Sequence, residues 1–152
     1  MQTDTLAIDF GTSNSAAAIC SGNGIHRIPI ETGAETLPTA VFFPVDGTGM
    51  RIGAAATEAL IQGEEGRYMR ALKSVLGQPL MHEERLLGGQ RRSISDVISD
   101  FLSEVRRRAE KHTGKRFHRA LSGRPVHFFS ARPDKDEQAE DDLRTCYLAA
   151  GF

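Results

Sequence analysis

The chain has 152 residues, of which 39% are hydrophobic and 26% are charged, and its formal net charge is −1 at pH 7. This length fits one domain with a hydrophobic core of its own. The balanced charge gives no electrostatic reason to expect nucleic acid or an anionic membrane as a partner, and no apolar run is long enough to span a bilayer. No basic segment followed by an apolar one opens the chain, so we expect no secretory signal and a cytoplasmic protein.

The N-terminal motif is an apolar strand, a glycine turn and a second strand. Residues 6–10 and 15–20 are predicted to pair across the turn 11–14. Backbone N–H groups in such a turn converge on an anion, and Gly11 supplies a conformation that a bulkier residue would resist. Asp9, near the end of the first strand, is placed to hold Mg²⁺ through water. The alternative interpretation is ordinary turn chemistry between two strands.

The next elements are predicted from turn residues and hydrophobic spacing. Residues 25–30 alternate as a third strand, and 37–43 form an apolar strand. A short strand over 50–52 and a helix over 53–60 follow, and the apolar spacing within 67–76 predicts a further helix. Residues 78–92 show no readable pattern.

A long amphipathic helix is predicted between Ser93, its N-cap, and Gly114, its C-cap. A strand over 117–129 and a helix over 134–151 complete the chain. The predicted buried face of the long helix comprises Ile94, Val97, Ile98, Phe101, Leu102 and Val105. This order predicts a mixed α/β fold: a ribonuclease H-like half-domain that starts with a three-stranded meander, is flanked by helices and contains a small inserted α+β subdomain.

Other charged and reactive residues are assigned ordinary roles. The arginines 106–108 are interleaved with glutamates and predict a solvated helix face, not a nucleic-acid contact. The acids of 134–142 lack a calcium-loop pattern and predict a solvated helix start, and the histidines, His127 included, show no ligand spacing. Cys20 and Cys146 are expected to be small buried residues without a redox or zinc role.

Residues 8–15 read Ile-Asp-Phe-Gly-Thr-Ser-Asn-Ser. This block resembles the first phosphate motif of the actin-like ATPases, most closely the Ile-Asp-Leu-Gly-Thr-Thr-Asn-Ser of the heat shock protein 70 (Hsp70) chaperones. Further blocks resemble this family in the same order: Leu-Pro-Thr-Ala-Val at 37–41, Ala-Leu-Lys-Ser-Val-Leu-Gly at 71–77, Arg-Pro-Val-His-Phe at 124–128 and Ala-Ala-Gly-Phe at 149–152.

The resemblance implies an ATP/ADP and Mg²⁺ site in the first turn. Asp9 matches the residue that organises the Mg²⁺ shell, and Thr12 and Ser13 match residues that contact the phosphates. Gly11 and Asn14 complete the cofactor-binding turn.

Lys73 matches the family's lysine that positions the attacking water and stabilises charge during cleavage of the γ-phosphate. Phosphoryl transfer needs positioning and charge neutralisation more than covalent help, which suits this assignment of Asp9 and Lys73 as catalytic residues. The alternative for Lys73 is an exposed helix lysine.

The resemblance also divides the chain. Residues 1–37 and 91–152 are expected to form the ribonuclease H-like part of an N-terminal lobe, and 38–90 the inserted subdomain. The family's second phosphate motif, its catalytic glutamate segment, its adenosine motif and its peptide-binding domain do not occur in the sequence. We therefore expect a lobe that binds nucleotide weakly and hydrolyses it negligibly by itself.

The implied partners are an adenine nucleotide, the missing C-terminal lobe of the same protein and, through absent domains, co-chaperones and client proteins. The surface meant for the missing lobe is expected to favour self-association. Arg132 does not match the family's relay arginine, and the region 38–90 is shorter than usual, which favours a divergent bacterial branch.

Two other functions stay open. A sugar kinase of the same superfamily would share the Asp-x-Gly-Thr sequence of residues 9–12, but those enzymes usually lack the Asn-Ser ending at 14–15 and the lysine block at 71–77. A non-catalytic interaction domain would keep the fold and bind no adenine nucleotide.

Overall fold

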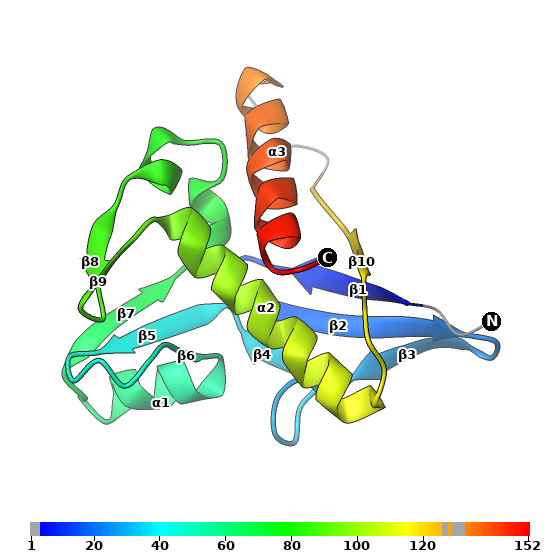
Figure 1. Ribbon diagram of the computed structural model, residues 1–152. Helices are drawn as coiled ribbons and strands as arrows, with labels where there is room; N and C mark the ends of the chain where they lie inside the picture. Colours follow the sequence, from blue (N-terminus) through cyan, green and yellow to red (C-terminus); the bar gives the residue numbers. More distant parts are fainter. Residues whose placement is uncertain (1–3, 126–127, 129–132) are drawn as a thin grey trace.

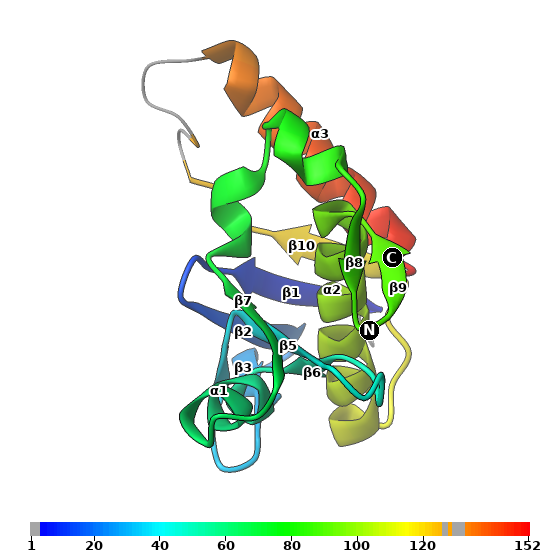
Figure 2. The same cartoon turned by 90° about the vertical axis from the view of Figure 1, so that its left-hand side faces the viewer.

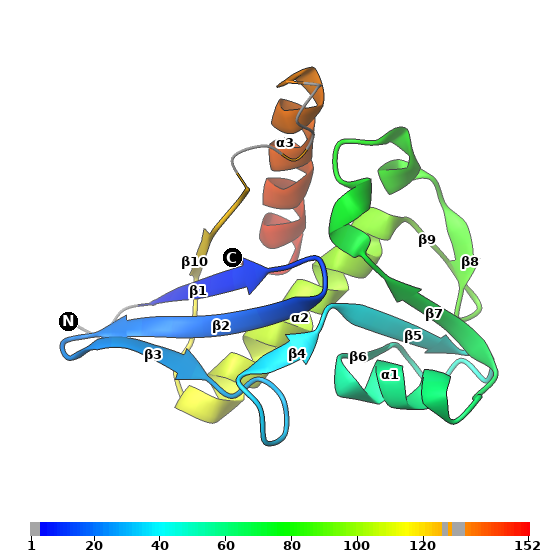
Figure 3. The ribbon, with the colours of Figure 1, turned by 180° about the vertical axis from the view of Figure 1, so that it is seen from behind.

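The computed structural model describes residues 4–125, 128 and 133–152. It has a mixed α/β fold in which helix α2 crosses two β-sheets and α3 stands beside the first of them (Figure 1). Figure 2 and Figure 3 show the same arrangement from the side and from behind, where the first sheet lies in front of α2. None of the helices in the described ranges combines the length and apolar character that crossing a membrane requires.

The bounds of the elements are as follows. The strands are β1 Thr5–Phe10, β2 Asn14–Ser21, β3 Gly24–Ile28, β4 Thr36–Pro38, β5 Ala40–Pro44, β6 Arg51–Ile52, β7 Gly66–Arg70, β8 Arg85–Leu87, β9 Gln90–Arg92 and β10 Arg119–Ser122. The helices are α1 Ala54–Ile61, α2 Ile94–Thr113 and α3 Pro133–Ala149, and two short 3₁₀ segments are η1 Leu72–Val75 and η2 Pro79–His82.

The largest sheet has the strand order β10-β1-β2-β3, and β4 pairs with a further stretch of β2. β1, β2 and β3 form the antiparallel meander that the turns predict, whereas β10 runs parallel to β1. A parallel neighbour requires a long connection, and here the chain passes through the second sheet and α2 before it returns as β10.

Alternation along β1 divides this sheet into a core face and an exposed face. Leu6, Ile8 and Phe10 are almost completely buried, and the ring of Phe10 meets that of Phe101 on α2 edge-to-face with centroids 5.8 Å apart. Because successive side chains in a strand point to opposite faces, the exposed Asp9 lies on the face away from α2.

Helix α2 is bounded by both of its predicted caps. The Ser93 hydroxyl accepts a hydrogen bond from the Asp96 N–H at 3.1 Å, and the Asp96 carboxylate accepts one from the Ser93 N–H at 2.9 Å. The helix ends at Gly114, whose φ of 68° is left-handed and suits glycine. Every residue of the predicted apolar face is buried, which confirms that face.

The single strand predicted over 37–43 is in fact two strands in different sheets. β4 pairs with β2, whereas β5 pairs with β6 and β7 in the second sheet. The chain changes sheet at Thr39, next to Pro38, whose missing N–H cannot continue a ladder.

The prediction of a helix over 67–76 is wrong. β7 occupies the first part and pairs antiparallel with β5, with Ala40 opposite Arg70 and Pro44 opposite Gly66. The helical spacing of the apolar residues corresponds only to η1. β7 is a strand because it pairs with β5, which is distant in the sequence, and the local spacing of apolar residues does not reveal this pairing. Residues 78–92 form η2 and the hairpin β8–β9. β10 covers only part of the strand predicted over 117–129, of which residues 126–127 and 129 lie outside the described part of the chain.

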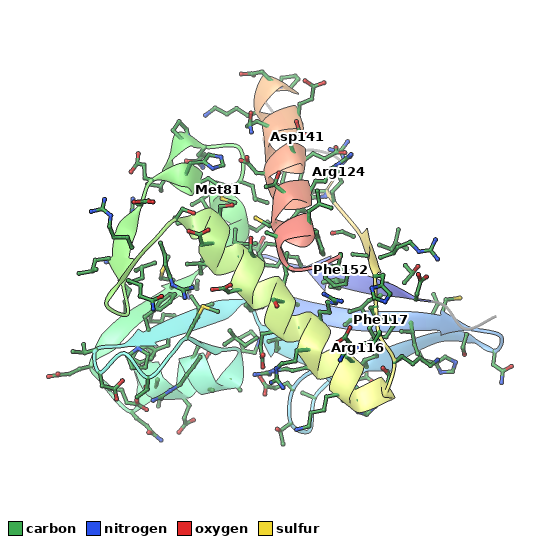
Figure 4. All side chains as sticks on the ribbon, viewed as in Figure 1. Met81, Arg116, Phe117, Arg124, Asp141 and Phe152 are labelled. Atoms are coloured by element: carbon green, nitrogen blue, oxygen red, sulfur yellow. The ribbon has the colours of Figure 1, made fainter. Side chains whose placement is uncertain are left out.

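Two of the three arginines on α2 are structural. The guanidinium carbon of Arg106 lies 5.3 Å from the ring centroid of Phe152, which is labelled in Figure 4. Arg108 donates a hydrogen bond to the Ile30 carbonyl at 3.0 Å. The prediction of a solvated position is therefore correct only for Arg107, whose side chain is 62% exposed.

The observed burial also corrects the predictions for the cysteines and for the acids of α3. Cys146 is buried as predicted, but Cys20 is exposed, so its predicted burial is wrong. The acidic segment of α3 is only partly solvated, because the side chains of Asp136 and Asp142 are buried and only 9% and 4% exposed.

Ser93→Ala should lower the free energy of unfolding by about 1 kcal/mol, because the Asp96 N–H loses its cap. Ser103 is exposed within the same helix, so Ser103→Ala is the matched control and should change stability by less than about 0.5 kcal/mol. Urea denaturation of both variants measures the difference, and equal midpoints would contradict the role of the capping box.

Candidate functional site

The turn between β1 and β2 is tightly closed. The pairing of Asp9 with Ala16 holds the two strands together just before it. A Cβ atom added to Gly11 would lie 2.1 Å from the Asn14 carbonyl oxygen, far inside contact distance. Gly11 is therefore required by close approach of the backbone; its φ is not among the positive values found for other glycines of the chain.

The polar side chains of this turn are available to a ligand. Asp9, Thr12, Ser13 and Asn14 are all exposed. None of these four side chains makes a hydrogen bond or ion pair with another residue that the structure describes. The carboxylate, hydroxyl and amide groups that the sequence predicted as phosphate and Mg²⁺ contacts are thus gathered at one hairpin end and are not used by the fold.

A buried junction attaches the second sheet to this turn. The Thr39 N–H donates to the Ser13 carbonyl at 2.9 Å. The Thr39 hydroxyl lies 2.7 Å from the Ser15 hydroxyl, and both residues are 1% exposed. The sequence pattern gives no sign that Thr39 joins two sheets; the proline before it is the available signal for a change of sheet.

The same junction leads to the predicted lysine. Thr39 is followed by Ala40, which pairs with Arg70 at the end of β7. One residue later Ala71 turns the chain into η1, which carries Lys73. Figures 1, 2 and 3 agree that η1 lies beside the β1–β2 turn. The two sequence blocks 8–15 and 71–77 are therefore neighbours in space, and the Lys73 side chain is partly buried.

The backbone immediately before Lys73 has an unusual conformation. Ala71 has φ 55° and ψ 35°, the left-handed region, and no other non-glycine residue among those described has a positive φ. Alanine adopts this region at a cost of roughly 1 kcal/mol. The Ser74 N–H and hydroxyl both bond the Ala71 carbonyl, at 3.0 and 2.7 Å, and hold the turn closed.

Helix α3 places a buried phenol, that of Tyr147, against β10. The Tyr147 hydroxyl donates to the Ser122 hydroxyl at 2.9 Å. Burial raises the pKa of Tyr147 to about 12; the Ser122 hydrogen bond lowers this pKa, and the negative charge of Asp9 raises it. The phenol is therefore neutral near pH 7 and acts as a hydrogen-bond donor, not as a charged group.

Asp9 does not belong to a metal cage in the part of the chain that the structure describes. Within the residues that the structure describes, no three His, Cys, Asp or Glu side chains gather so that they could hold a metal ion. A Mg²⁺ ion at Asp9 would depend on water and on phosphate oxygens for most of its ligands, which is how this small ion usually binds together with nucleotides. His127 and Arg132 lie outside the described residues.

Comparisons with known proteins extend the resemblance seen in the motifs. No family model matches the chain. It is 28% identical over 144 residues to the chaperone protein DnaK of Cenarchaeum symbiosum, 28% over 150 residues to that of Methanothermobacter thermautotrophicus and 26% over 141 residues to that of Endomicrobium trichonymphae. These alignments cover 92%, 96% and 90% of this chain.

The chain is Hsp70-like. The resemblance predicted from the motifs is confirmed, because the similarity to DnaK extends over nearly the whole chain. The Hsp70-like chain spans about a fifth of the length of the curated relatives it matches, with 21%, 22% and 21% of each relative aligned. The mixed α/β fold is compatible with a lobe of an Hsp70 ATPase domain.

Gly11→Ala should open the first turn, because the new methyl group would collide with the Asn14 carbonyl oxygen. We expect a loss of about 1 to 3 kcal/mol in the free energy of unfolding. Gly22→Ala in the next hairpin turn is the matched control, because a Cβ there meets nothing within 4 Å. Chemical denaturation compares the two, and a Gly11→Ala variant as stable as Gly22→Ala would show that the turn is not closed as described.

Tyr147→Phe should change the alkaline stability profile. The folded chain keeps the Tyr147 proton up to about pH 12, whereas a tyrosine in the unfolded chain loses its proton near its ordinary pKa of about 10. The folded state thus binds more protons, so its stability is fully present below about pH 10 and falls as the pH rises toward 12, by on the order of 2 kcal/mol. Denaturation at about pH 9 and about pH 12 should show this fall in the wild type and not in Tyr147→Phe; identical profiles would contradict the buried phenol.

Proposed function

We propose that this chain is a ribonuclease H-like, N-terminal ATP-binding lobe of an Hsp70-type chaperone, with cytoplasmic localisation. In this proposal, residues 1–37 and 91–152 form the ribonuclease H-like part, and 38–90 the inserted subdomain. The meander β1–β2–β3 with β10 parallel to β1 supports this assignment, as does the similarity to DnaK over more than nine-tenths of the chain.

The observation that carries the nucleotide site is the placement of η1 beside an exposed, unused polar turn. Asp9 would hold Mg²⁺ through water, and the turn 11–14 would bind the phosphates with its backbone N–H groups and side chains. The Lys73 ammonium group would neutralise charge on the terminal phosphate. When bound, Mg-ATP would supply the scissile phosphoanhydride; the chain's own residues would orient it and exclude water from part of it.

The sequence spans about a fifth of the length of the DnaK relatives it matches. We infer that a second lobe completes the ATP site and that co-chaperones and clients bind through further domains. The exposed Leu121 and Leu148, each 65% exposed, support a docking surface for that lobe, because they line a cavity of about 510 Å³ between β10 and α3. The same surface would promote self-association of the isolated lobe.

Titration of the ¹⁵N-labelled chain with Mg-ATP tests the proposed site. The amide signals of 11–14 and of η1 should shift together along one saturable curve. Lys73→Ala should weaken ATP binding roughly tenfold, or ~1.4 kcal/mol, and weaken ADP binding less, because the ammonium group meets the terminal phosphate.

Lys111→Ala, which removes an exposed lysine on α2, is the matched control and should bind ATP as the wild type does. If Lys73→Ala matched Lys111→Ala, Lys73 would have no part in the site. If neither segment responded to Mg-ATP in the wild type, the nucleotide site would be rejected in favour of a non-catalytic interaction domain.

A further inference from the structure

Helix α3 places a buried carboxylate against the segment that follows Lys73. Asp142 is 4% exposed, and its Oδ2 accepts a hydrogen bond from the Gly77 N–H at 2.8 Å. Its Oδ1 accepts one from the Gln138 side-chain amide at 2.9 Å and lies 3.1 Å from the Nε2 of His82. One carboxylate thus contacts both ends of the segment 77–82 and its own helix.

The Gly77 end of this contact is coupled to η1. On either side of Gly77, the Leu76 N–H bonds the Lys73 carbonyl at 3.3 Å and the Gln78 N–H bonds the Val75 carbonyl at 3.1 Å. Gly77 itself has φ 75°, and a Cβ there would lie 2.7 Å from a backbone oxygen of α3. Helix α3 therefore packs directly against Gly77, at the end of the turn that carries Lys73.

The other end of η1 is held by the second sheet. Arg70 pairs with Ala40 in the ladder between β7 and β5, and the left-handed Ala71 follows at once. With Asp142 at the far end, the short η1 segment is fixed from two directions. The sheet holds its start, and α3 holds its end.

Stability of the fold alone does not explain a buried carboxylate well, because burying a charged group is costly. A carboxylate that leaves water needs several hydrogen bonds to offset its desolvation, and an apolar residue of similar size often serves a core equally well. Asp142 accepts one such bond from the Gly77 N–H in the segment after Lys73 and one from Gln138 on its own helix, and it also lies beside His82 of that segment. His82, by contrast, keeps 59% of its side chain exposed and does not bury the pair completely.

We propose that Asp142 is a positioning residue for Lys73: by holding the Gly77 N–H from α3, it fixes the turn that aims the lysine at a bound nucleotide. This inference rests on the proposed nucleotide site. It assigns α3 a role in that site through a residue that does not itself touch the nucleotide.

Paramagnetic broadening by Mn-ATP tests the inference on the 152-residue chain. Mn²⁺ replaces Mg²⁺ and broadens the amide signals of residues near the bound nucleotide. In the wild type we expect broadening at 11–14 and at 72–75. In Asp142→Ala, the signals of 11–14 should still broaden, whereas those of 72–75 should lose most of their broadening.

Asp142→Asn keeps an oxygen that can accept the Gly77 hydrogen bond and should restore the broadening at 72–75. Asp141→Ala is the matched control, because Asp141 is the exposed neighbour on the same helix, labelled in Figure 4. It should broaden as the wild type does. If Asp142→Ala does not fold, Asp142→Ser replaces it, since a hydroxyl on this shorter side chain does not reach Gly77.

The outcomes separate the two proposals. Equal broadening of 72–75 in wild type and Asp142→Ala would overturn the positioning role and leave the nucleotide site standing. Loss of broadening at both segments in a folded Asp142→Ala variant would also overturn it, because the effect would not be specific to η1. Absence of broadening at both segments in the wild type would reject the nucleotide site itself.

Discussion

One buried residue, Thr39, joins the five-stranded sheet to the three-stranded sheet. Its N–H bonds the Ser13 carbonyl and its hydroxyl bonds that of Ser15, so the junction touches the backbone of the first turn and the strand that leaves it. A buried hydroxyl without a partner costs about 1 to 3 kcal/mol, and the hydrogen bond between the two hydroxyls at this junction gives each of them a partner. β5 begins directly after Thr39, β7 pairs with β5, and η1 follows β7. The position of Lys73 relative to Asp9 therefore depends on Thr39.

Helix α3 adds a second set of constraints from the β10 edge of the five-stranded sheet. Tyr147 connects this helix to β10 through Ser122, and Asp142 connects it to the loop after η1. η1 is therefore held at its start by the second sheet and just beyond its end by α3, whereas the first turn is held by Thr39. Apolar packing brings these elements together, whereas directional hydrogen bonds decide their mutual register.

The sequence predicts features that depend on neighbouring residues and misses those that depend on distant ones. Ser93 and Gly114 were readable because caps are local, and the residues of the first turn were readable as a motif. β7 was not, because its strand state requires β5. The buried position of Asp142 leaves no local signal, since it follows several other acids along a helix whose acidic part reads as solvated. The motif thus predicted which segments to compare, but the path through Thr39, Ala40 and Arg70 places η1, the segment that carries Lys73, beside the turn.

Helix α1 rests on the second sheet almost entirely through alanine. Ala56 and Ala59 are fully buried in a small cluster with Ala40 and Phe42, whereas the last residues of the helix, Leu60 and Ile61, are 50% and 74% exposed. Such a contact allows close approach but removes little apolar surface from water. Local unfolding should therefore begin at α1, which can detach at a smaller free energy than the elements of the main core. η1, anchored in that core by Leu72, would stay folded while the outer layer exchanges its amide hydrogens with solvent.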